Sequence, residues 1–594
     1  MRLAHISLAF AGLMWVLPFL YYHHALPLPA FYQEWGAAML GLCAMPLLVT
    51  QRFWQQPKIP RIVLLPAGLT LLVLVQFALG RVAYFDQALL FALYMLWVAL
   101  LIMLGHRLRE ELGLPALATA LAVFLLLGAE LNALVGVLQH YRWHIFLDAV
   151  IMAKVSVAVY GNMGQPNDFA NYVTLGLVSL GLLHTRWRLR AWQVVLLAAP
   201  LLFVLTLSGS RSTWLYLLCM VGMAFLWSRR NKSNQTLLYY SLLLLIGFVL
   251  MHLVVQIPWL AGSSGSITSA QRLFFDEGAN DSNSIRLRLW REAWLIFTQF
   301  PWLGAGFGQF AWQHFQIGPV SHNNFGPEWQ AHNIIMQIAA EMGLAGLLIL
   351  FSTLALWFWQ ARSEQRTPYH WWGCALLVML AIHSLLEFPL WFAYFLGVAA
   401  LTLGMLDTTT CRLELRGMGR LSVAAMLLLG LLSLSQMLYI YGYHDLEGGT
   451  DTFRASKTDA SYAQHIRTQR LYDDMAAIQG RALLLRPYVE RLLGDSGWDH
   501  VADNRALNGR VMHSVPTSLV VYREALLLAR AGQQAKACAQ IERAIWIYPS
   551  DFPVVHGQLR TLADMDTNPA RFSALLECAL QKYEERERLI HATH

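Results

Sequence analysis

Residues 88–104 read ALLFALYMLWVALLIML, a run of 17 residues that contains no charged side chain. A helix of this length is about 25 Å long, which nearly spans the roughly 30 Å of hydrocarbon in a bilayer. The run therefore predicts a transmembrane helix. Further apolar runs of comparable length predict twelve more, near residues 6–22, 35–50, 62–79, 116–139, 169–184, 192–207, 213–227, 237–256, 333–359, 371–387, 390–406 and 421–441.

The composition agrees with a membrane protein and excludes an ordinary soluble enzyme. Of the 594 residues, 57% are hydrophobic and 13% are charged, whereas soluble domains average about 45–50% apolar and about 25% charged residues. Residues 442–594 carry 18 Lys/Arg and 19 Asp/Glu, and residues 1–441 carry the other 25 Lys/Arg and 17 Asp/Glu. The net positive charge thus belongs to the apolar part of the chain and does not indicate a nucleic-acid-binding domain.

These patterns predict an all-α polytopic membrane protein of about 13 transmembrane helices with a soluble helical domain at its C-terminus. We expect a transmembrane domain over residues 1–441, with a large loop over residues 257–332, and the soluble domain over residues 442–594. Residues 522–549 resemble one tetratricopeptide-type helical hairpin, which usually needs neighbours to bury its apolar face. Segments 460–493 and 553–591 are the candidate neighbours, and an ordinary helical bundle is the alternative.

Lys and Arg in the short connections predict how the chain is inserted in the membrane. One alternate set of connections holds 17 positive charges, and the opposite set holds only Arg81, Arg142, Lys154 and Arg211. Because positively charged connections remain in the cytoplasm, we expect a cytoplasmic N-terminus. An odd number of helices then places the 257–332 loop and the C-terminal domain on the far side of the membrane.

Cys538 and Cys578 lie in the predicted C-terminal domain, on the side of the membrane where disulfides form. A disulfide between them and two separate buried thiols are both compatible with the sequence. The chain has six cysteines and no CxxC motif, so we expect no zinc site.

Four polar motifs lie where even-numbered helices are predicted to begin at the far side. They are GNMGQPNDFANY (161–172), SGSR (208–211), HNNFGPEWQAHN (322–333) and EFPLWFAY (387–394). Polar groups at membrane depth are functional candidates, and helix N-termini attract anions because they present free N–H groups and partial positive charge. With Arg211 and the loop arginines, the motifs predict an anion site at this boundary.

Structural interpretations compete with the functional one at several of these positions. Asn167 or Asp168 is well suited to cap a helix, and Arg211 could be an interfacial residue whose charged end reaches water. His383 and Glu387 are four residues apart on one helical face, so a buried structural pair is as reasonable as a functional one. We expect His314 and His322 to be structural and His332, at a helix entrance, to be functional.

The ordered motifs resemble those of the O-antigen ligase and polymerase superfamily. The resemblance covers residues 160–405 and rests on GNMGQPNDFANY, SGSRSTW, SIRLRLWREAW with PWLGAGFGQF, QAHNIIMQIAAEMGLAG and HSLLEFPLWFAYFLG. The QPN turn, the EFPLWFAYF segment and the C-terminal extension are most similar to the PglL-type bacterial O-oligosaccharyltransferases, which glycosylate pilins and other exported proteins. Ala331 stands where the ligases commonly have Ser or Thr.

The resemblance implies transfer of a glycan from undecaprenyl pyrophosphate to a Ser/Thr hydroxyl at the periplasmic face of the bacterial inner membrane. By motif position it makes His332, Gln165 and Tyr394 the catalytic residues. It assigns pyrophosphate binding to Arg211 and Arg286, and we expect the loop residue Arg288 to contribute to the same site. We expect Asn167, Asn333 and Glu387 to have supporting roles. The implied partners are the lipid-linked oligosaccharide, a pilin-like acceptor protein and membrane lipid, with no nucleic acid and no cofactor.

The chemistry of these residues fits that activity. A hydroxyl is a weak nucleophile near neutral pH, and histidine is a suitable general base. Arginines and helix N-termini can stabilise the departing pyrophosphate. Because the far-side connections within residues 1–441 carry no DxD motif or tight carboxylate cluster, we expect transfer without a metal. The alternatives are an O-antigen ligase with lipid A-core as acceptor, an O-antigen polymerase and, less favoured, a transporter.

Overall fold

The computed structural model describes residues 2–454 and 501–592, apart from short gaps. These gaps are residues 25–27, 144, 259, 261–267, 275–276, 324, 362–366, 413–415, 514–515 and 566–568. Helices make up almost all of the described chain, and the sole sheet in these ranges is a two-stranded antiparallel ladder. The predicted all-α class is confirmed. The candidate helical segment 460–493 lies outside the described residues.

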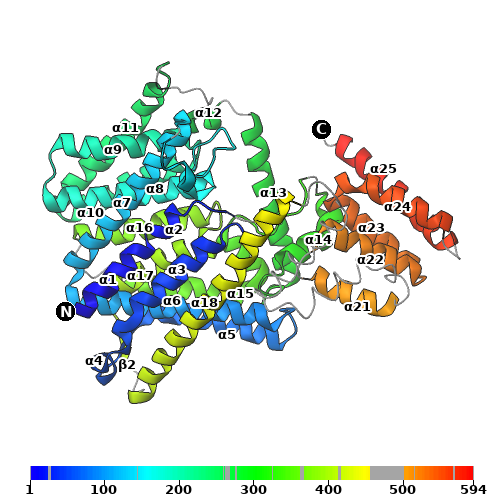
Figure 1. The fold of residues 1–594 in the computed structure, drawn as a ribbon, viewed down its shortest axis with the longest axis horizontal. Coiled ribbons are helices and arrows are strands. Elements are labelled where there is room, and N and C mark those ends of the chain that lie inside the picture. The colour runs from blue at the N-terminus through cyan, green and yellow to red at the C-terminus, as the bar shows by residue number, and fades with distance from the viewer. Residues whose placement is uncertain are drawn as a thin grey trace. The chain divides into compact units, whose positions relative to one another are not determined.

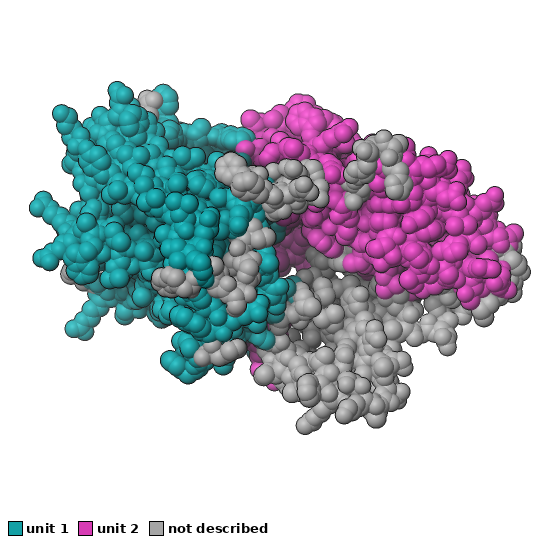
Figure 2. Space-filling view, turned by 90° about the horizontal axis from the view of Figure 1, so that it is seen from above, with its two compact units in different colours: residues 1–69, 93–283, 349–436 teal, residues 70–92, 284–348, 437–594 magenta. Residues whose placement is uncertain are grey.

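The described chain forms two compact units, which are coloured separately in Figure 2. Unit 1 comprises residues 1–69, 93–283 and 349–436, and unit 2 comprises residues 70–92, 284–348 and 437–594. Several helices contribute residues to both units. The division of the chain into a transmembrane domain and a soluble domain at residue 441 remains a prediction.

The helices and strands follow one another along the chain as labelled in Figure 1. Their bounds are α1 (Arg2–Met14), α2 (Leu17–Leu20), α3 (Phe31–Ala44), α4 (Gln51–Gln55), β1 (Lys58–Pro60), α5 (Leu64–Ala78), α6 (Phe85–Leu112), α7 (Leu114–Tyr141), α8 (Pro166–Trp187), α9 (Ala191–Leu207), α10 (Ser212–Arg230), α11 (Gln235–Val254), α12 (Ser269–Phe274), α13 (Glu277–Gln299), α14 (Phe310–Ser321), α15 (Ile334–Ala361), α16 (Pro368–Ser384), α17 (Ala393–Leu406), β2 (Thr410–Arg412), α18 (Arg416–Arg454), α21 (Val501–Met512), α22 (Ser518–Arg530), α23 (Gln534–Ile547), α24 (Phe552–Met565) and α25 (Pro569–Ala592).

Each of the thirteen apolar runs lies on helix, but fewer helices are long and apolar enough to cross a membrane by themselves. In the described ranges seven reach that length and composition: Arg2–Leu20, Arg61–Ala78, Phe85–Leu112, Leu114–Tyr141, Lys232–Val254, Ile334–Gln360 and Met418–Tyr439. The helices α9 and α17 are apolar but shorter. The chain is thus a multi-pass membrane protein, while the number of thirteen spans is not confirmed.

The helices α7 and α8 pack closely because small residues lie between them. A side chain at Gly176 would collide with Ala129, and one at Gly128 would collide with the Tyr172 hydroxyl. That hydroxyl donates a 2.7 Å hydrogen bond to the carbonyl of Trp15, which also ties the N-terminal helices to α8. Small residues allow membrane helices to approach in this way, and here the approach fixes the helix that begins with the QPN turn.

In unit 2 the long loop and the C-terminal helices share one hydrophobic core. The helix α14 packs against α23, and Phe315 of α14 is buried in the cluster formed by α21–α25. His322, which the sequence marks as a loop histidine, ends α14 and stacks on Trp546 with 5.4 Å between ring centroids. The tetratricopeptide-like repeat is not confirmed, although α22 and α23 do form a packed helical pair over the predicted hairpin.

Cys538 of α23 and Cys578 of α25 form a disulfide, which decides the alternative that the sequence left open. The bridge closes a loop with a sequence separation of 40 residues. In the chain-entropy description such a bridge stabilises the folded state by about 4 kcal/mol.

Removal of this bridge should therefore destabilise the C-terminal helices. We expect Cys538→Ser, with Cys578→Ser, to expose α21–α25 to limited proteolysis at a lower temperature than in the wild-type chain. The same substitution at Cys219, which is a free cysteine on α10, serves as the control. Equal protease resistance of the double variant and the wild type would contradict a stabilising bridge.

Candidate active site

The helix α8 begins at the QPN turn, and Gln165 is its N-cap. The Gln165 side-chain oxygen accepts a 2.6 Å hydrogen bond from the backbone N–H of Asp168, and Pro166 occupies the first helical position. The expectation that Asn167 or Asp168 caps this helix is therefore wrong. The longer glutamine reaches the same N–H group, which releases the Asn167 and Asp168 side chains for contacts with other helices.

Asn167 joins three of the four polar motifs. Its amide nitrogen donates to Glu387 at 2.9 Å, and its amide oxygen accepts from the Ser210 hydroxyl at 2.8 Å. Ser210 immediately precedes Arg211, which is the N-cap residue of α10. The QPN, SGSR and EFPLWFAY motifs are far apart in sequence, and this one side chain holds them together in unit 1.

Asp168 and His383 form a second buried contact between α8 and α16. The imidazole Nε2 of His383 lies 2.8 Å from Asp168 Oδ1, and the two side chains are 0% and 9% exposed. The expected structural pair of His383 with Glu387 is thus wrong, because the His383 imidazole contacts Asp168 and the Glu387 carboxylate contacts Asn167.

Tyr394 lies in the first turn of α17, and Glu34 of α3 holds the start of this helix. The Glu34 carboxylate accepts the Ala393 backbone N–H at 3.0 and 2.9 Å and the Tyr94 hydroxyl at 2.8 Å. The Tyr394 ring stacks on Phe392 and meets the edge of Phe19. The orientation of Tyr394 therefore depends on N-terminal residues that lie outside the segment 160–405 of the family resemblance.

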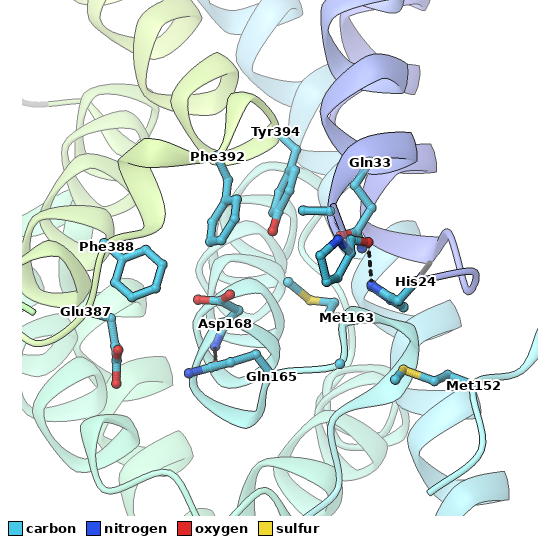
Figure 3. Close-up of a pocket in the computed structure, with 13 residues that line it drawn as sticks. His24, Gln33, Met152, Met163, Gln165, Asp168, Glu387, Phe388, Phe392 and Tyr394 are labelled. Atoms are coloured by element: carbon cyan, nitrogen blue, oxygen red, sulfur yellow. Dashed lines mark hydrogen bonds between the residues drawn. The ribbon is translucent and has the colours of Figure 1, made fainter. Parts of the chain in front are cut away.

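These elements enclose a pocket with a volume of about 260 Å³, which we call the QPN pocket (Figure 3). The Asp168 carboxylate and the Tyr394 hydroxyl are both directed into it. Its lining consists of residues from the N-terminal region, the QPN turn and the segment before α17: His24, Pro29, Ala30, Gln33, Met152, Met163, Gly164, Gln165, Asp168, Glu387, Phe388, Phe392 and Tyr394.

The predicted base, His332, belongs to unit 2 and immediately precedes α15. Its backbone is in the left-handed region, with φ of 49°. Asn333 caps α15 by accepting the N–H groups of Ile335 and Met336 at 3.0 and 3.1 Å, and Gln337 accepts the Ala331 N–H at 2.7 Å. Both flanks of His332 are thus fixed, and the fixed turn offsets the cost of about 1–3 kcal/mol that such a backbone carries.

The His332 imidazole faces a carboxylate that is itself held by a buried pair. His332 Nε2 lies 3.8 Å from Glu328 Oε2. The Glu328 backbone N–H lies 3.2 Å from His314 Nε2, and the other nitrogen of His314 lies 2.6 Å from Glu292 on α13. Because His314 and Glu292 are both 1% exposed, the expected structural role of His314 agrees with its position.

Arg286 and Arg288 are half-buried residues of α13 in unit 2, and the Arg288 guanidinium lies over the Phe325 ring at 5.7 Å. The structure therefore gathers Gln165, Asn167, Glu387 and Tyr394 in unit 1, with Arg211 next to the Ser210 contact. It places His332 and Asn333 at one turn of unit 2.

Across the described residues, no group of three or more His, Cys, Asp or Glu side chains is arranged to hold a metal ion.

Two known families match the segments that carry these motifs. Residues 196–351 match the family described as O-antigen ligase, and residues 371–559 match the family described as the C-terminal part of a virulence factor membrane-bound polymerase. The first match contains Arg211, Arg286 and His332, and the second contains Glu387 and Tyr394.

Two proteins of Acinetobacter baylyi are similar over most of their length. A general O-oligosaccharyltransferase is 27% identical over 412 residues, which cover 67% of this chain and 68% of the relative. A ComP-specific O-oligosaccharyltransferase is 21% identical over 345 residues, which cover 57% of this chain and 60% of the relative. By these matches the chain is similar to the O-antigen ligase superfamily and, within it, to the PglL-type O-oligosaccharyltransferases.

The motifs that carry the resemblance omit several residues that shape the candidate site. His24, Gln33 and Glu34 come from the N-terminal region, and Glu328 lies in the loop before the HN motif. A signal for two of them is visible in the sequence, because Gln33 and Glu34 are polar residues in the first turn of an apolar helix, where polar groups are costly.

Proposed function

We propose that the protein transfers a glycan en bloc from undecaprenyl pyrophosphate to Ser or Thr hydroxyls of exported proteins such as pilins. The observation that carries this proposal is the Asn167 junction, which brings three motifs of the superfamily together beside a pocket. The similarity to two proteins named O-oligosaccharyltransferases supports the transferase activity. The carrier lipid and the class of acceptor are the proposed parts.

In the proposed mechanism His332 acts as the general base. Its imidazole removes the proton from the acceptor hydroxyl while the hydroxyl oxygen forms a bond to the anomeric carbon of the first sugar. The bond from that carbon to the pyrophosphate oxygen breaks, and undecaprenyl pyrophosphate leaves as an anion. We propose that Arg211, Arg286 and Arg288 stabilise this leaving group in place of a metal ion, and that Glu328 orients the imidazole.

Gln165 and Tyr394 act on the donor in this proposal, and Asn167, Asn333 and Glu387 hold the motifs in place. The Gln165 oxygen is engaged in the α8 cap, so its amide nitrogen is the group that serves the donor. The Tyr394 hydroxyl serves as a hydrogen-bonding group in the QPN pocket.

We also propose that the reaction takes place at the periplasmic face of the inner membrane and that α21–α25 lie in the periplasm. The Cys538–Cys578 disulfide supports this placement, because such bonds persist in oxidising compartments. The excess of Lys and Arg in one set of connections supports it independently.

This orientation predicts that a reporter joined after residue 445 is active in the periplasm. An alkaline phosphatase fusion should be active there, and a green fluorescent protein fusion at the same residue should be dark when exported through the general secretion route. The matched control is a pair of fusions after residue 230, at the end of α10, where we expect the opposite result. Cytoplasmic activity after residue 445 would contradict the proposed orientation.

Reconstitution tests the acceptor. Purified protein in liposomes is supplied with an undecaprenyl pyrophosphate-linked glycan and, in parallel, with a pilin or with lipid A-core. We expect the pilin to gain the whole glycan in one step, seen as a single mass increase. Glycosylation of lipid A-core, or extension of the donor glycan itself, would instead establish the ligase or the polymerase that the two family descriptions name.

A further inference from the structure

The lining of the QPN pocket differs from that of an anion site. The pocket presents the carboxylates of Asp168 and Glu387 and the aromatic rings of Phe388 and Phe392, and no described lysine or arginine lines it. Two carboxylates repel a pyrophosphate. They accept hydrogen bonds from hydroxyl groups, however, and aromatic faces pack against the C–H groups of a ring. The lining therefore suits a neutral group with many hydroxyls.

Gln33 supplies a second, independent observation. Its side chain lines the pocket, the residue is 2% exposed, and its amide nitrogen has no hydrogen-bond partner within the described protein. An unsatisfied buried donor costs about 1–3 kcal/mol, and such groups are rare in folded proteins. A ligand oxygen that accepts this N–H group would remove the cost, so the orphaned donor indicates a missing acceptor in the pocket.

The acceptor groups of the pocket are held in place before any ligand arrives. Asp168 is fixed by His383 and by the Gln165 cap, and Glu387 is fixed by Asn167. On the opposite wall, Glu34 fixes the start of α17 next to Tyr394. Rigid hydrogen-bonding groups discriminate between ligands that differ by one hydroxyl.

Arg211 indicates which part of the donor reaches the pocket. It follows Ser210, whose hydroxyl contacts Asn167, and Asn167 in turn contacts the pocket residue Glu387. A pyrophosphate bound by Arg211 would therefore lie beside the QPN pocket within unit 1. The group attached directly to that pyrophosphate is the first sugar of the glycan.

We propose that the QPN pocket binds the first sugar of the lipid-linked glycan and that Gln33 determines which sugars are accepted. This inference rests on the proposed function. The Gln33 amide donates to one hydroxyl or N-acetyl oxygen of that sugar, Asp168 and Glu387 accept from its hydroxyls, and the ring packs on the Phe388 and Phe392 faces.

The test compares Gln33→Met, which keeps the length of the side chain and removes the amide, with Met39→Leu on the same helix as control. Each protein receives the natural donor and a series of donors that each lack one polar group on the first sugar. We expect Gln33→Met to lower kcat/KM for the natural donor about tenfold, as loss of one buried hydrogen bond does. For one donor of the series, the wild type and the variant should have the same kcat/KM. That donor lacks the sugar oxygen that accepts the hydrogen bond from Gln33, so removal of the Gln33 amide has no further effect.

A parallel binding assay separates this inference from the proposed function. Binding of the glycosylated carrier and of bare undecaprenyl pyrophosphate is measured without any acceptor. We expect the glycosylated carrier to bind more tightly than the bare carrier in the wild type, and this difference in affinity to be smaller in Gln33→Met.

The two assays together have distinct outcomes. If transfer proceeds but Gln33→Met has the same kcat/KM as the wild type for every donor, the inference is wrong and the function stands. If no acceptor is modified while the binding difference depends on Gln33, the inference stands and the function is wrong. Gln33→Asn, which keeps a shortened amide, replaces Gln33→Met if that variant does not fold.

Discussion

His332→Ala should lower the rate of glycan transfer by about 10²–10⁴-fold, the usual loss for a positioned general base. The histidine is held between an α15 cap at Asn333 and the Gln337 contact to Ala331, and its imidazole faces Glu328 at 3.8 Å. Alanine removes the imidazole without removing either backbone contact. The protein should therefore remain folded and bind the lipid-linked donor as the wild type does.

The measurement is single-turnover transfer in liposomes, with and without added imidazole. Free imidazole should restore part of the activity of His332→Ala, because it can take the place of the missing base. The matched control is His322→Ala, which removes an exposed imidazole at the end of α14 that stacks on Trp546. Its effect should be small. Near-normal transfer by well-folded His332→Ala would refute the assignment of the base.

Arg211→Ala should lower transfer by about 10²–10³-fold, because removal of one preformed group that stabilises developing charge has this effect. Arg211 is at the N-cap position of α10, where backbone N–H groups and the guanidinium can face the same anion. The transfer rate of Arg211→Ala should be lowest at low concentrations of the lipid-linked donor and should recover only partly when the donor is saturating. The control is Arg229→Ala at the other end of α10, which should leave transfer unchanged.

A chelator distinguishes this arrangement from metal-assisted transfer. We expect EDTA to leave the wild-type rate unchanged, because positive side chains supply the charge that a divalent ion would otherwise supply. An absolute requirement for a divalent metal would contradict the proposed binding of pyrophosphate by arginine. Arg286→Ala on α13 should also lower the transfer rate, as Arg211→Ala does.

The sequence predicted those features that depend on neighbouring residues. Apolar runs marked the helices, and the run over residues 333–359 located the start of α15 beside His332. The N-cap of α8 was mispredicted because Asn and Asp are the usual caps, whereas the structure uses the longer Gln165. That choice depends on where the segment before α10 and the helix α16 lie, since Asn167 contacts Ser210 of that segment and Asp168 contacts His383 of α16.

The remaining parts of the site come from contacts over long sequence separations. Glu34 and Ala393 are 359 residues apart, and no periodicity or local motif reports such a pair. The disulfide was open for the same reason, because two cysteines on different helices bond only if tertiary packing aligns them. The number of spans remains a prediction, since helices such as α8 carry buried polar residues, including Asp168, Asn171 and Thr174, which apolar runs alone do not reveal.

The helix α14 contacts both the C-terminal helices and the turn before α15, and this has a consequence for the engineering of chimaeras. Phe315 of this helix is buried with α21–α25, and the adjacent His314 holds the turn that bears Glu328. A graft that replaces only the sequence after residue 441 would leave a foreign α23 against the native α14. A chimaera that exchanges the C-terminal helices between homologous enzymes should therefore transplant residues 284–348 with them, so that α14 and the core around Phe315 come from the same protein.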